Sequence, residues 1–334
     1  HVTPTVEVHP FRVGMRLRFR RVDHRDGMLV HGPAGWAEFS PFPDYGPEYA
    51  SRWLAAAIES ATTAPPAPRR ETVAVNTTVP AVGPDTAFAL VQASGCTTAK
   101  VKVAEPGQDL SDDVERVAAV RDALGPDGRV RIDANGGWDL ETAVLAVKRL
   151  ASVAAGLEYA EQPCRTVEEL AALRRRVDVA IAADESIRTG DDPIRVARLD
   201  AADLVVVKVQ PLGGISRVLE VVDRCGLPAV VSSAVETSVG LAAGVALAAA
   251  LPRLPYACGL GTATLLESDV VHDPLVPVAG HLPVRTVAPA PDLLASARPS
   301  DEDAAALLAR FDAAAQHLEG VAGDIARGRV EGGR

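Results

Sequence analysis

The chain has 334 residues, of which 48% are hydrophobic and 23% are charged, a composition typical of a globular protein with a sizeable core. Its 34 basic and 44 acidic residues give a formal net charge of −10, which disfavours binding to nucleic acid. No uncharged apolar stretch reaches the roughly 20 residues of a membrane span, and no secretory signal is visible. The four cysteines are scattered without a CxxC pair, so we expect free thiols in a cytoplasmic protein that binds no membrane.

The first 60 or so residues predict a small α+β unit. Residues 12–25 and 28–39 alternate loosely between apolar and polar positions, and Asp26-Gly27 between them is a typical hairpin turn. Gly46-Pro47 begins a helical pattern that runs to about Ala61. A Pro-rich connector follows at 62–68, so we assign residues 1–68 to a first α+β domain.

Beyond this connector, short β-rich runs alternate with helical stretches. The eight runs lie at 73–79, 99–103, 130–134, 157–160, 179–183, 204–209, 229–232 and 256–260. Such alternation implies a parallel sheet with right-handed crossovers, and a closed barrel is the simplest arrangement for eight strands. A doubly wound open sheet is the alternative, but the Gly-rich phosphate loop that it favours is absent from the sequence. We therefore predict a barrel over residues 69–286.

The alternation stops after Leu265, and the last part of the chain has a different character. Residues 273–291 are rich in Pro and Val, and 301–325 predict one helix. We expect the segment 287–334 to pack back across the first domain. Residues 327–334 are polar and contain Gly, which predicts a disordered end.

Charged residues interrupt five successive β-rich runs near their carboxyl ends. They are Lys100 and Lys102, Asp133 with Asn135, Glu161, Asp184, and Lys208. From Lys102 onward the charged positions are separated by 23 to 31 residues, which is one strand-helix unit each. In a barrel the carboxyl ends of the strands surround the active site, so these side chains are expected to meet there.

The three carboxylates of Asp133, Glu161 and Asp184 predict a cation site. Carboxylates that converge repel one another and raise their own pKa values unless positive charge lies between them. A donor set made only of oxygen favours Mg²⁺, for which Mn²⁺ can substitute. Glu185 remains an alternative to Asp184. None of the seven histidines follows a strand, so a zinc hydrolase and a histidine base find no support.

Lysines must then carry the proton chemistry. A second cation nearby disfavours the charged form of an ammonium group, so the arrangement of Lys100 beside Lys102, both near Mg²⁺, can bring one of the two lysines into the working range. Two other interpretations remain open. Lys208 can be the nucleophile of a Schiff-base aldolase, or the barrel can bind a ligand without catalysis.

At these positions the sequence resembles the muconate-lactonizing branch of the enolase superfamily, which has a KxK pair (Lys100-Val101-Lys102 here) and a lone lysine opposite (Lys208). The resemblance implies an α/β fold in which a modified TIM barrel, (β/α)7β, is covered by an α+β cap built from the N-terminus and the C-terminal tail. It also implies that Asp133, Glu161 and Asp184 bind Mg²⁺, that Lys102 is the acid and base, that Lys208 is its counterpart, and that Lys100 is an auxiliary group.

Within this branch the chain is similar to the o-succinylbenzoate synthase family. The matching stretches are 35–43 (GWAEFSPFP), 133–138 (DANGGW), 232–240 (SSAVETSVG) and 258–262 (CGLGT). This resemblance implies dehydration of succinyl-hydroxy-cyclohexadiene-carboxylate in menaquinone biosynthesis. The eighth strand lacks the DxD of dipeptide epimerases, and the seventh lacks the histidine of mandelate-racemase relatives. Racemisation of N-succinylamino acids uses the same two lysines and remains the alternative.

We expect the substrate to be a small-molecule carboxylate. Hydroxyls and backbone amides in the loop that starts at Ser232 and Ser233 suit a carboxylate, although an ordinary strand-to-helix cap explains the loop equally well. Glycines on the eighth strand let a ligand approach the backbone. The candidate substrate contacts are Asn135, Ser232, Ser233, Gly259, Gly261 and Arg20.

Overall fold

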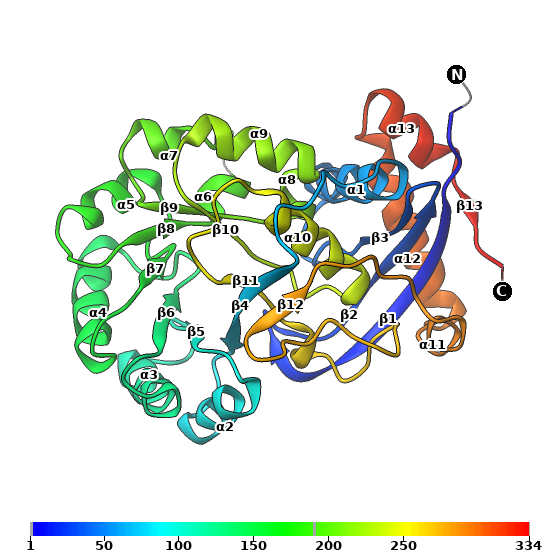
Figure 1. Ribbon diagram of the computed structural model, residues 1–334. Helices are drawn as coiled ribbons and strands as arrows, with labels where there is room; N and C mark the ends of the chain where they lie inside the picture. The colour runs from blue at the N-terminus through cyan, green and yellow to red at the C-terminus, as the bar shows by residue number, and fades with distance from the viewer. Residues whose placement is uncertain (1–2, 190–191, 334) are drawn as a thin grey trace.

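Eight parallel strands form a ring in the computed structural model, which describes residues 3–189 and 192–333 (Figure 1). The strands are β4 (Thr72–Val79), β5 (Thr98–Lys102), β6 (Arg129–Asp133), β7 (Tyr159–Glu161), β8 (Ile181–Ala183), β9 (Leu204–Val207), β10 (Ala229–Val231) and β11 (Cys258–Gly261). They pair in the order β10-β9-β8-β7-β6-β5-β4-β11, and a bridge between Ser232 and Gly259 links the two ends. The predicted barrel is therefore confirmed, with all eight strands close to their expected positions.

Helices surround the ring because the outward residues of the strands are apolar and need cover (Figure 1). They are α2 (Pro84–Ser94), α3 (Leu110–Leu124), α4 (Leu140–Val153), α5 (Val167–Arg174), α6 (Glu185–Arg188), α7 (Arg195–Arg198), α8 (Val209–Leu212), α9 (Ile215–Cys225) and α10 (Ser238–Ala250). Capping side chains define where they begin: Asp109 and Thr166 each complete a capping box at the start of α3 and α5.

Alternate strand residues point into the barrel and fill it. A separate apolar cluster contains Tyr159, Leu204, Val206 and Val230. Because side chains alternate along a strand, Glu161 lies on the same face of β7 as Tyr159 and points to the barrel axis. The packed interior thus forms a floor beneath the charged residues at the strand ends.

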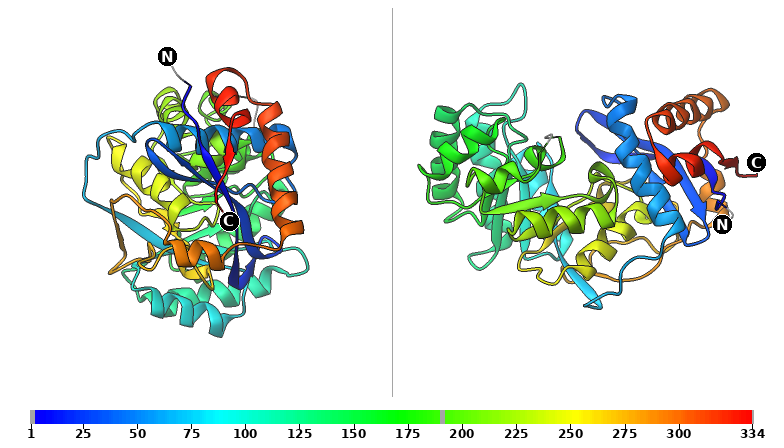
Figure 2. Two further views of the ribbon diagram at one scale, coloured as in Figure 1. Left: turned by 90° about the vertical axis from the view of Figure 1, so that its right-hand side faces the viewer. Right: turned by 90° about the horizontal axis from the view of Figure 1, so that it is seen from above.

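A second unit, the cap domain, is built from both ends of the chain. Its sheet has the order β13-β1-β2-β3, with β1 (Glu7–Phe19), β2 (Val22–Gly32), β3 (Gly35–Phe39) and β13 (Val330–Glu331). Its helices are α1 (Pro47–Thr62), α11 (Pro291–Ser296), α12 (Asp301–Gln316) and α13 (Gly320–Arg327). Figure 2 shows α12 and α13 beside the blue N-terminal elements, and Phe39 packs edge-on against Phe311 at 5.4 Å between ring centroids. This confirms a cap made from the N-terminus and the C-terminal tail.

The predicted hairpin turn at Asp26-Gly27 is wrong, because both residues lie within β2. The turn is instead at Arg20-Arg21, which joins β1 to β2 with φ values of 47° and 64°. These are left-handed conformations that Asn and Gly normally supply in a two-residue hairpin. Glycine is needed at position 27 for a different reason, because a Cβ there would lie 2.1 Å from the carbonyl oxygen of Phe39. Its position is set by the close approach of β3.

The end of the chain also differs from expectation. The predicted helix over 301–325 is two helices, because α12 ends at Gln316 and Gly320, with a φ of 65°, begins α13. The predicted disorder of 327–334 is wrong for the residues of β13, where Val330 pairs with Glu7 of β1. Before the tail reaches the cap, β12 (His281–Pro283) pairs antiparallel with β4.

All four cysteines are free, as predicted, and the structure also buries all of them. None of the helices in residues 3–189 and 192–333 is both long and apolar enough to cross a membrane.

Candidate active site

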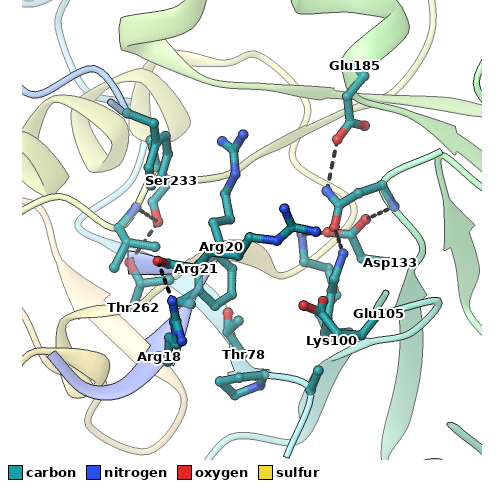
Figure 3. A pocket seen from close by; sticks show the side chains of 18 of the residues that line it. Arg18, Arg20, Arg21, Thr78, Lys100, Glu105, Asp133, Glu185, Ser233 and Thr262 are labelled. Carbon is teal, nitrogen blue, oxygen red and sulfur yellow. Dashed lines mark hydrogen bonds and ion pairs between the residues drawn. The ribbon is translucent and has the colours of Figure 1, made fainter. Parts of the chain in front are cut away.

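A cavity of about 970 Å³ lies between the carboxyl ends of the barrel strands and the cap. In Figure 3, Lys100, Asp133 and Glu185 are drawn on one side and Ser233 and Thr262 on the other. Seven basic and four acidic side chains line it: Arg18, Arg20, Arg21, Lys100, Lys102, Arg188 and Lys208, against Asp44, Glu105, Asp133 and Glu185. A cavity with an excess of positive charge in an acidic protein favours an anionic ligand.

Lys100 lies between two of the predicted cation ligands. Its Nζ is 2.9 Å from Oε2 of Glu161 and 3.7 Å from Oδ2 of Asp133. Burial and then the charge of Asp133 raise the pKa of Glu161 to about 8. Burial acts to lower the pKa of Lys100, but the charges of Glu161 and Asp133 outweigh it and raise that pKa. Two carboxylates thus crowd each other here, with one ammonium as counter-charge.

Asp184 and Lys208 form the second charged pair. Asp184 follows β8 directly and precedes α6, whereas Lys208 follows β9 and precedes α8. The Lys208 Nζ is 2.8 Å from Oδ2 of Asp184, and Nε of Arg188 is 3.1 Å from Oδ1. Burial opposes ionisation of Asp184, but the charges of Lys208 and Arg188 outweigh it and hold its pKa well below the usual range. This carboxylate is therefore ionised in the folded protein.

Lys102 extends from the end of β5 and meets Asn135. Its Nζ donates to Oδ1 of Asn135, whose Nδ2 donates to Oε1 of Glu185 at 2.8 Å. Asn135 has a φ of 47°, and its backbone amide donates to Asp133 Oδ1 at 3.0 Å. The Asn135 amide therefore links the lysine on β5 to the carboxylate after β8.

The carboxylate cluster fits a hard divalent cation. Within the described residues, no three His, Cys, Asp or Glu side chains form a ready-made metal centre. The donors of Asp133, Glu161 and Asp184 are nevertheless all oxygens, the ligand type of Mg²⁺. In addition, the Oε2 atom of Glu185 is buried and has no hydrogen-bond partner among residues 3–189 and 192–333. A cation among these groups would relieve both the crowded charge and the unpaired oxygen.

The predicted substrate contacts separate into two groups. Ser233 lines the cavity, and its hydroxyl lies 2.7 Å from that of Thr262. Ser232, Gly259 and Gly261 are not among the lining residues. A Cβ on Gly259 would lie 2.5 Å from Ser232 Oγ, and one on Gly261 would lie 2.5 Å from the Asn76 carbonyl oxygen. These two glycines are therefore explained by tight strand packing around β11.

Arg20 lies at the tip of the β1–β2 hairpin and lines the cavity. Its guanidinium stacks over the ring of Phe42 at 4.2 Å and donates to the Tyr45 hydroxyl at 3.1 Å. Figure 3 shows Arg20 and Arg21 between the two sides of the pocket. The cap thus contributes positive charge opposite the barrel acids.

Arg188 and Tyr45 are among the residues of this region that were not predicted from the sequence. Arg188 follows Asp184 by four positions on a helical turn, and this spacing was a signal that it pairs with the carboxylate. Tyr45 carried no local signal, because its hydroxyl meets Arg188 across 143 positions of sequence.

The chain matches two family models, Enolase N-terminal domain-like over residues 11–61 and Enolase C-terminal domain-like over residues 85–289. Among solved structures it is similar to 2-chloromuconate cycloisomerase from Rhodococcus opacus, with a TM-score of 0.76 and 22% identity over 90% of this chain and 100% of that one. The N-succinyl Arg/Lys racemase from Bacillus cereus gives a TM-score of 0.74 and 18% identity, with 89% and 98% covered. These likenesses show the fold.

Two curated relatives are much closer in sequence. The o-succinylbenzoate synthase of Thermobifida fusca is 64% identical over 83% of this chain and 87% of that protein. The o-succinylbenzoate synthase of Mycobacterium leprae is 53% identical over 85% of this chain and 84% of that protein. The chain therefore belongs to the o-succinylbenzoate synthase family of the enolase superfamily, a family of carbon–oxygen lyases.

Proposed function

We propose that this enzyme dehydrates succinyl-hydroxy-cyclohexadiene-carboxylate to o-succinylbenzoate in menaquinone biosynthesis. The observation that carries the proposal is the position of Lys102 and Lys208 on opposite sides of a basic cavity next to Asp133, Glu161 and Asp184. The relatives that share more than half of their aligned residues with this chain carry the name of that synthase.

Asp133, Glu161 and Asp184 would hold Mg²⁺, and Mn²⁺ would substitute for it. The bound cation would supply positive charge beside the substrate carboxylate, whose α-proton is otherwise hard to remove. Lys100 stays next to Glu161 and Asp133, where its ammonium group adds to the positive potential around Lys102.

Lys102 is the acid and base of the proposed reaction. Its neutral amine takes the α-proton, and the C–H electron pair moves onto the carboxylate to form an enediolate. When that pair returns to the ring, the C–O bond to the hydroxyl breaks, and the Lys102 ammonium gives its proton to the departing oxygen. The products are water and an aromatic ring, and Lys102 is a neutral amine again.

Lys208 acts from the other side of the cavity. Its ammonium group stabilises the negative charge of the enediolate without transferring a proton. The Asp184 carboxylate holds that ammonium at 2.8 Å, in a buried position where the ion pair is weakly screened. The two lysines thus have different tasks on the two faces of one substrate.

The substrate carries two carboxylates, which suits the excess of basic side chains in the cavity. We assign the succinyl carboxylate to Arg20 at the hairpin tip. The hydroxyls of Ser233 and Thr262 complete the opposite wall as neutral hydrogen-bonding groups. Phe42, which lies beneath Arg20, offers an apolar surface for the methylene carbons of the succinyl arm.

A spectrophotometric assay tests the proposal, because the absorbance changes when the ring becomes aromatic. We expect the Mg²⁺-supplemented enzyme to convert the cyclohexadiene to o-succinylbenzoate, and Lys148→Ala to behave like the wild type, since Lys148 lies exposed on α4. No conversion under these conditions would contradict the proposal.

Racemisation of N-succinylamino acids is a second candidate, and one observation favours it. Lys102 and Lys208 stand on opposite sides of the cavity, so Lys208 can protonate the carbon from the face opposite to that deprotonated by Lys102. Exchange of the α-proton for deuterium in N-succinylamino acids measures this activity directly.

A further inference from the structure

The guanidinium group of Arg188 is buried and forms hydrogen bonds with both the barrel and the cap domain. Arg188 lies on α6, and all three of its nitrogens have partners. Nε donates to Asp184 Oδ1 at 3.1 Å, Nη2 to Glu185 Oε1 at 3.1 Å, and Nη1 to the Tyr45 hydroxyl at 2.9 Å. Two of these groups are barrel carboxylates, whereas the third belongs to the cap.

These bonds assign a separate partner to each oxygen of Asp184. Oδ1 accepts from Arg188, and Oδ2 accepts from Lys208 at 2.8 Å. A guanidinium is planar, with donors in fixed directions, so it fixes the plane of a carboxylate better than an ammonium does. Arg188 thereby sets the orientation of the Asp184 carboxylate, whose Oδ2 accepts from Lys208 of the cavity wall.

Tyr45 in turn fixes Arg188. Its ring is enclosed by Phe42, Tyr49 and Trp53, with centroid distances of 6.3, 4.6 and 5.8 Å. The hydroxyl oxygen accepts from Arg188 Nη1 and also from Arg20 Nη2 at 3.1 Å. A continuous set of hydrogen bonds therefore runs from the hairpin arginine, through Tyr45 and Arg188, to Asp184.

We propose that Arg188 and Tyr45 are positioning residues that give Asp184 its affinity for the divalent cation, so that a cap residue controls a cation site on the barrel. The inference rests on the proposed function, in which Asp184 is a cation ligand. Partners that orient a metal-binding side chain typically change metal affinity about 10- to 100-fold when they are altered. Since neither residue would touch the cation, both would act through Asp184.

Two substitutions test this without changing any charge. Tyr45→Phe removes only the hydroxyl, and Arg188→Lys keeps a cation but loses the planar set of donors. A charge-neutral design is needed because loss of the Arg188 charge would by itself favour cation binding. Tyr256→Phe is the control: it also removes one tyrosine hydroxyl, but its ring lies 6.1 Å from that of Tyr159, in the apolar cluster that forms the barrel floor.

The measurement is Mn²⁺ binding to the metal-stripped full-length protein, followed by electron paramagnetic resonance of the free ion. We expect one Mn²⁺ per wild-type chain, a roughly three- to tenfold higher Kd for Tyr45→Phe, a rise of about 10- to 100-fold for Arg188→Lys, and a wild-type Kd for Tyr256→Phe. Thermal unfolding of the metal-free proteins shows whether each variant is folded.

The other results would overturn the inference in distinguishable ways. Wild-type affinity in folded Tyr45→Phe, or in folded Arg188→Lys, would show that Asp184 needs no positioning by that residue, and the cation site of the proposed function would still stand. An equal loss in Tyr256→Phe would show that losing a tyrosine hydroxyl far from Arg188 has the same effect, and would contradict the role of the Tyr45–Arg188 hydrogen bond. Failure of the wild type to bind Mn²⁺ would overturn the cation site itself, and this inference with it.

Discussion

Lys102 and Lys208 lie on opposite sides of the cavity. Lys102 is the last residue of β5 and Lys208 directly follows β9, and these two strands are four places apart in the ring of eight. Three of the four lysines in the whole chain, Lys100, Lys102 and Lys208, line this one cavity. In the proposed reaction this arrangement would place an amine on each face of the bound ring. It also separates the two proposed tasks, proton transfer and charge stabilisation, in a way that substitutions can test.

Lys102→Ala and Lys208→Ala should each lower kcat for dehydration by several orders of magnitude, since each removes a group that acts in the transition state. Lys148→Ala, on the exposed face of α4, is the control with wild-type turnover. Steady-state kinetics of the three variants checks this. A mild effect at Lys102 would contradict its role as the acid and base.

Chelation by EDTA should abolish activity, and Mg²⁺ or Mn²⁺ should restore it. Asp133→Ala, Glu161→Ala and Asp184→Ala should abolish activity in folded protein because each removes a proposed ligand. Asp223→Ala, exposed on α9, is the control. Glu185→Gln decides the remaining alternative: if it weakens Mn²⁺ binding more than Asp184→Asn does, Glu185 is the ligand. Full activity in metal-stripped enzyme would contradict the cation site.

Arg20→Ala should raise KM by roughly 10- to 100-fold, the equivalent of one charge-assisted hydrogen bond, with little change in kcat. The reason is that Arg20 is assigned to the succinyl carboxylate, which takes no part in the chemistry. Initial rates over a range of substrate concentrations give both constants. Arg217→Ala, which removes an exposed arginine on α9, is the control. An unchanged KM in Arg20→Ala would show that the succinyl carboxylate does not bind to Arg20.

Glu38 should make the stability of the protein depend on pH. It is buried between cap and barrel, where Oε1 accepts from the Thr237 amide at 3.1 Å and Oε2 from Ser40 Oγ at 2.7 Å. Burial and then the charge of Glu236 raise the pKa of Glu38 from its ordinary 4.5 to about 8, although Arg25 partly opposes this. Between these values the folded protein holds a proton that the unfolded chain releases, so the free energy of unfolding falls as pH rises.

Between these two pKa values, Glu38 lowers the free energy of unfolding by at most about 1.4 kcal/mol per pH unit. Glu38→Gln removes the titration, so its stability relative to wild type should increase as pH is raised from about 5 to 8. Urea unfolding at several pH values measures the difference, and Glu302→Gln, exposed on α12, is the control. Curves for Glu38→Gln and wild type that stay parallel across this range would show that Glu38 does not hold the proton.

Most of the barrel could be predicted because its signals are local. Strands such as β8, β9 and β10 are short runs of Val, Ile, Leu and Ala. The charged residues recur once per strand-helix unit, so neighbours in this series become neighbours around the ring. Asp133 is indeed the direct neighbour of both Lys102 and Glu161 in the sheet.

The features that could not be predicted depend on contacts between distant segments. Gly27 resembles a turn glycine in sequence, but the Phe39 carbonyl is what excludes a side chain there. Gly259 suggests a ligand contact, yet Ser232 of the neighbouring strand occupies the adjacent space. Tyr45 and Arg188 meet only when the cap docks on the barrel, so no local pattern indicates their hydrogen bond.

Whether the enzyme is a dehydratase or a racemase is tested most directly by comparing two rates on one preparation of the Mg²⁺-supplemented enzyme. These are dehydration of succinyl-hydroxy-cyclohexadiene-carboxylate and α-deuterium exchange into N-succinylamino acids. We predict that kcat/KM for dehydration exceeds that for exchange by orders of magnitude, and that Lys102→Ala abolishes dehydration. Fast exchange with negligible dehydration would leave the arrangement of the lysines intact and contradict the function proposed for them.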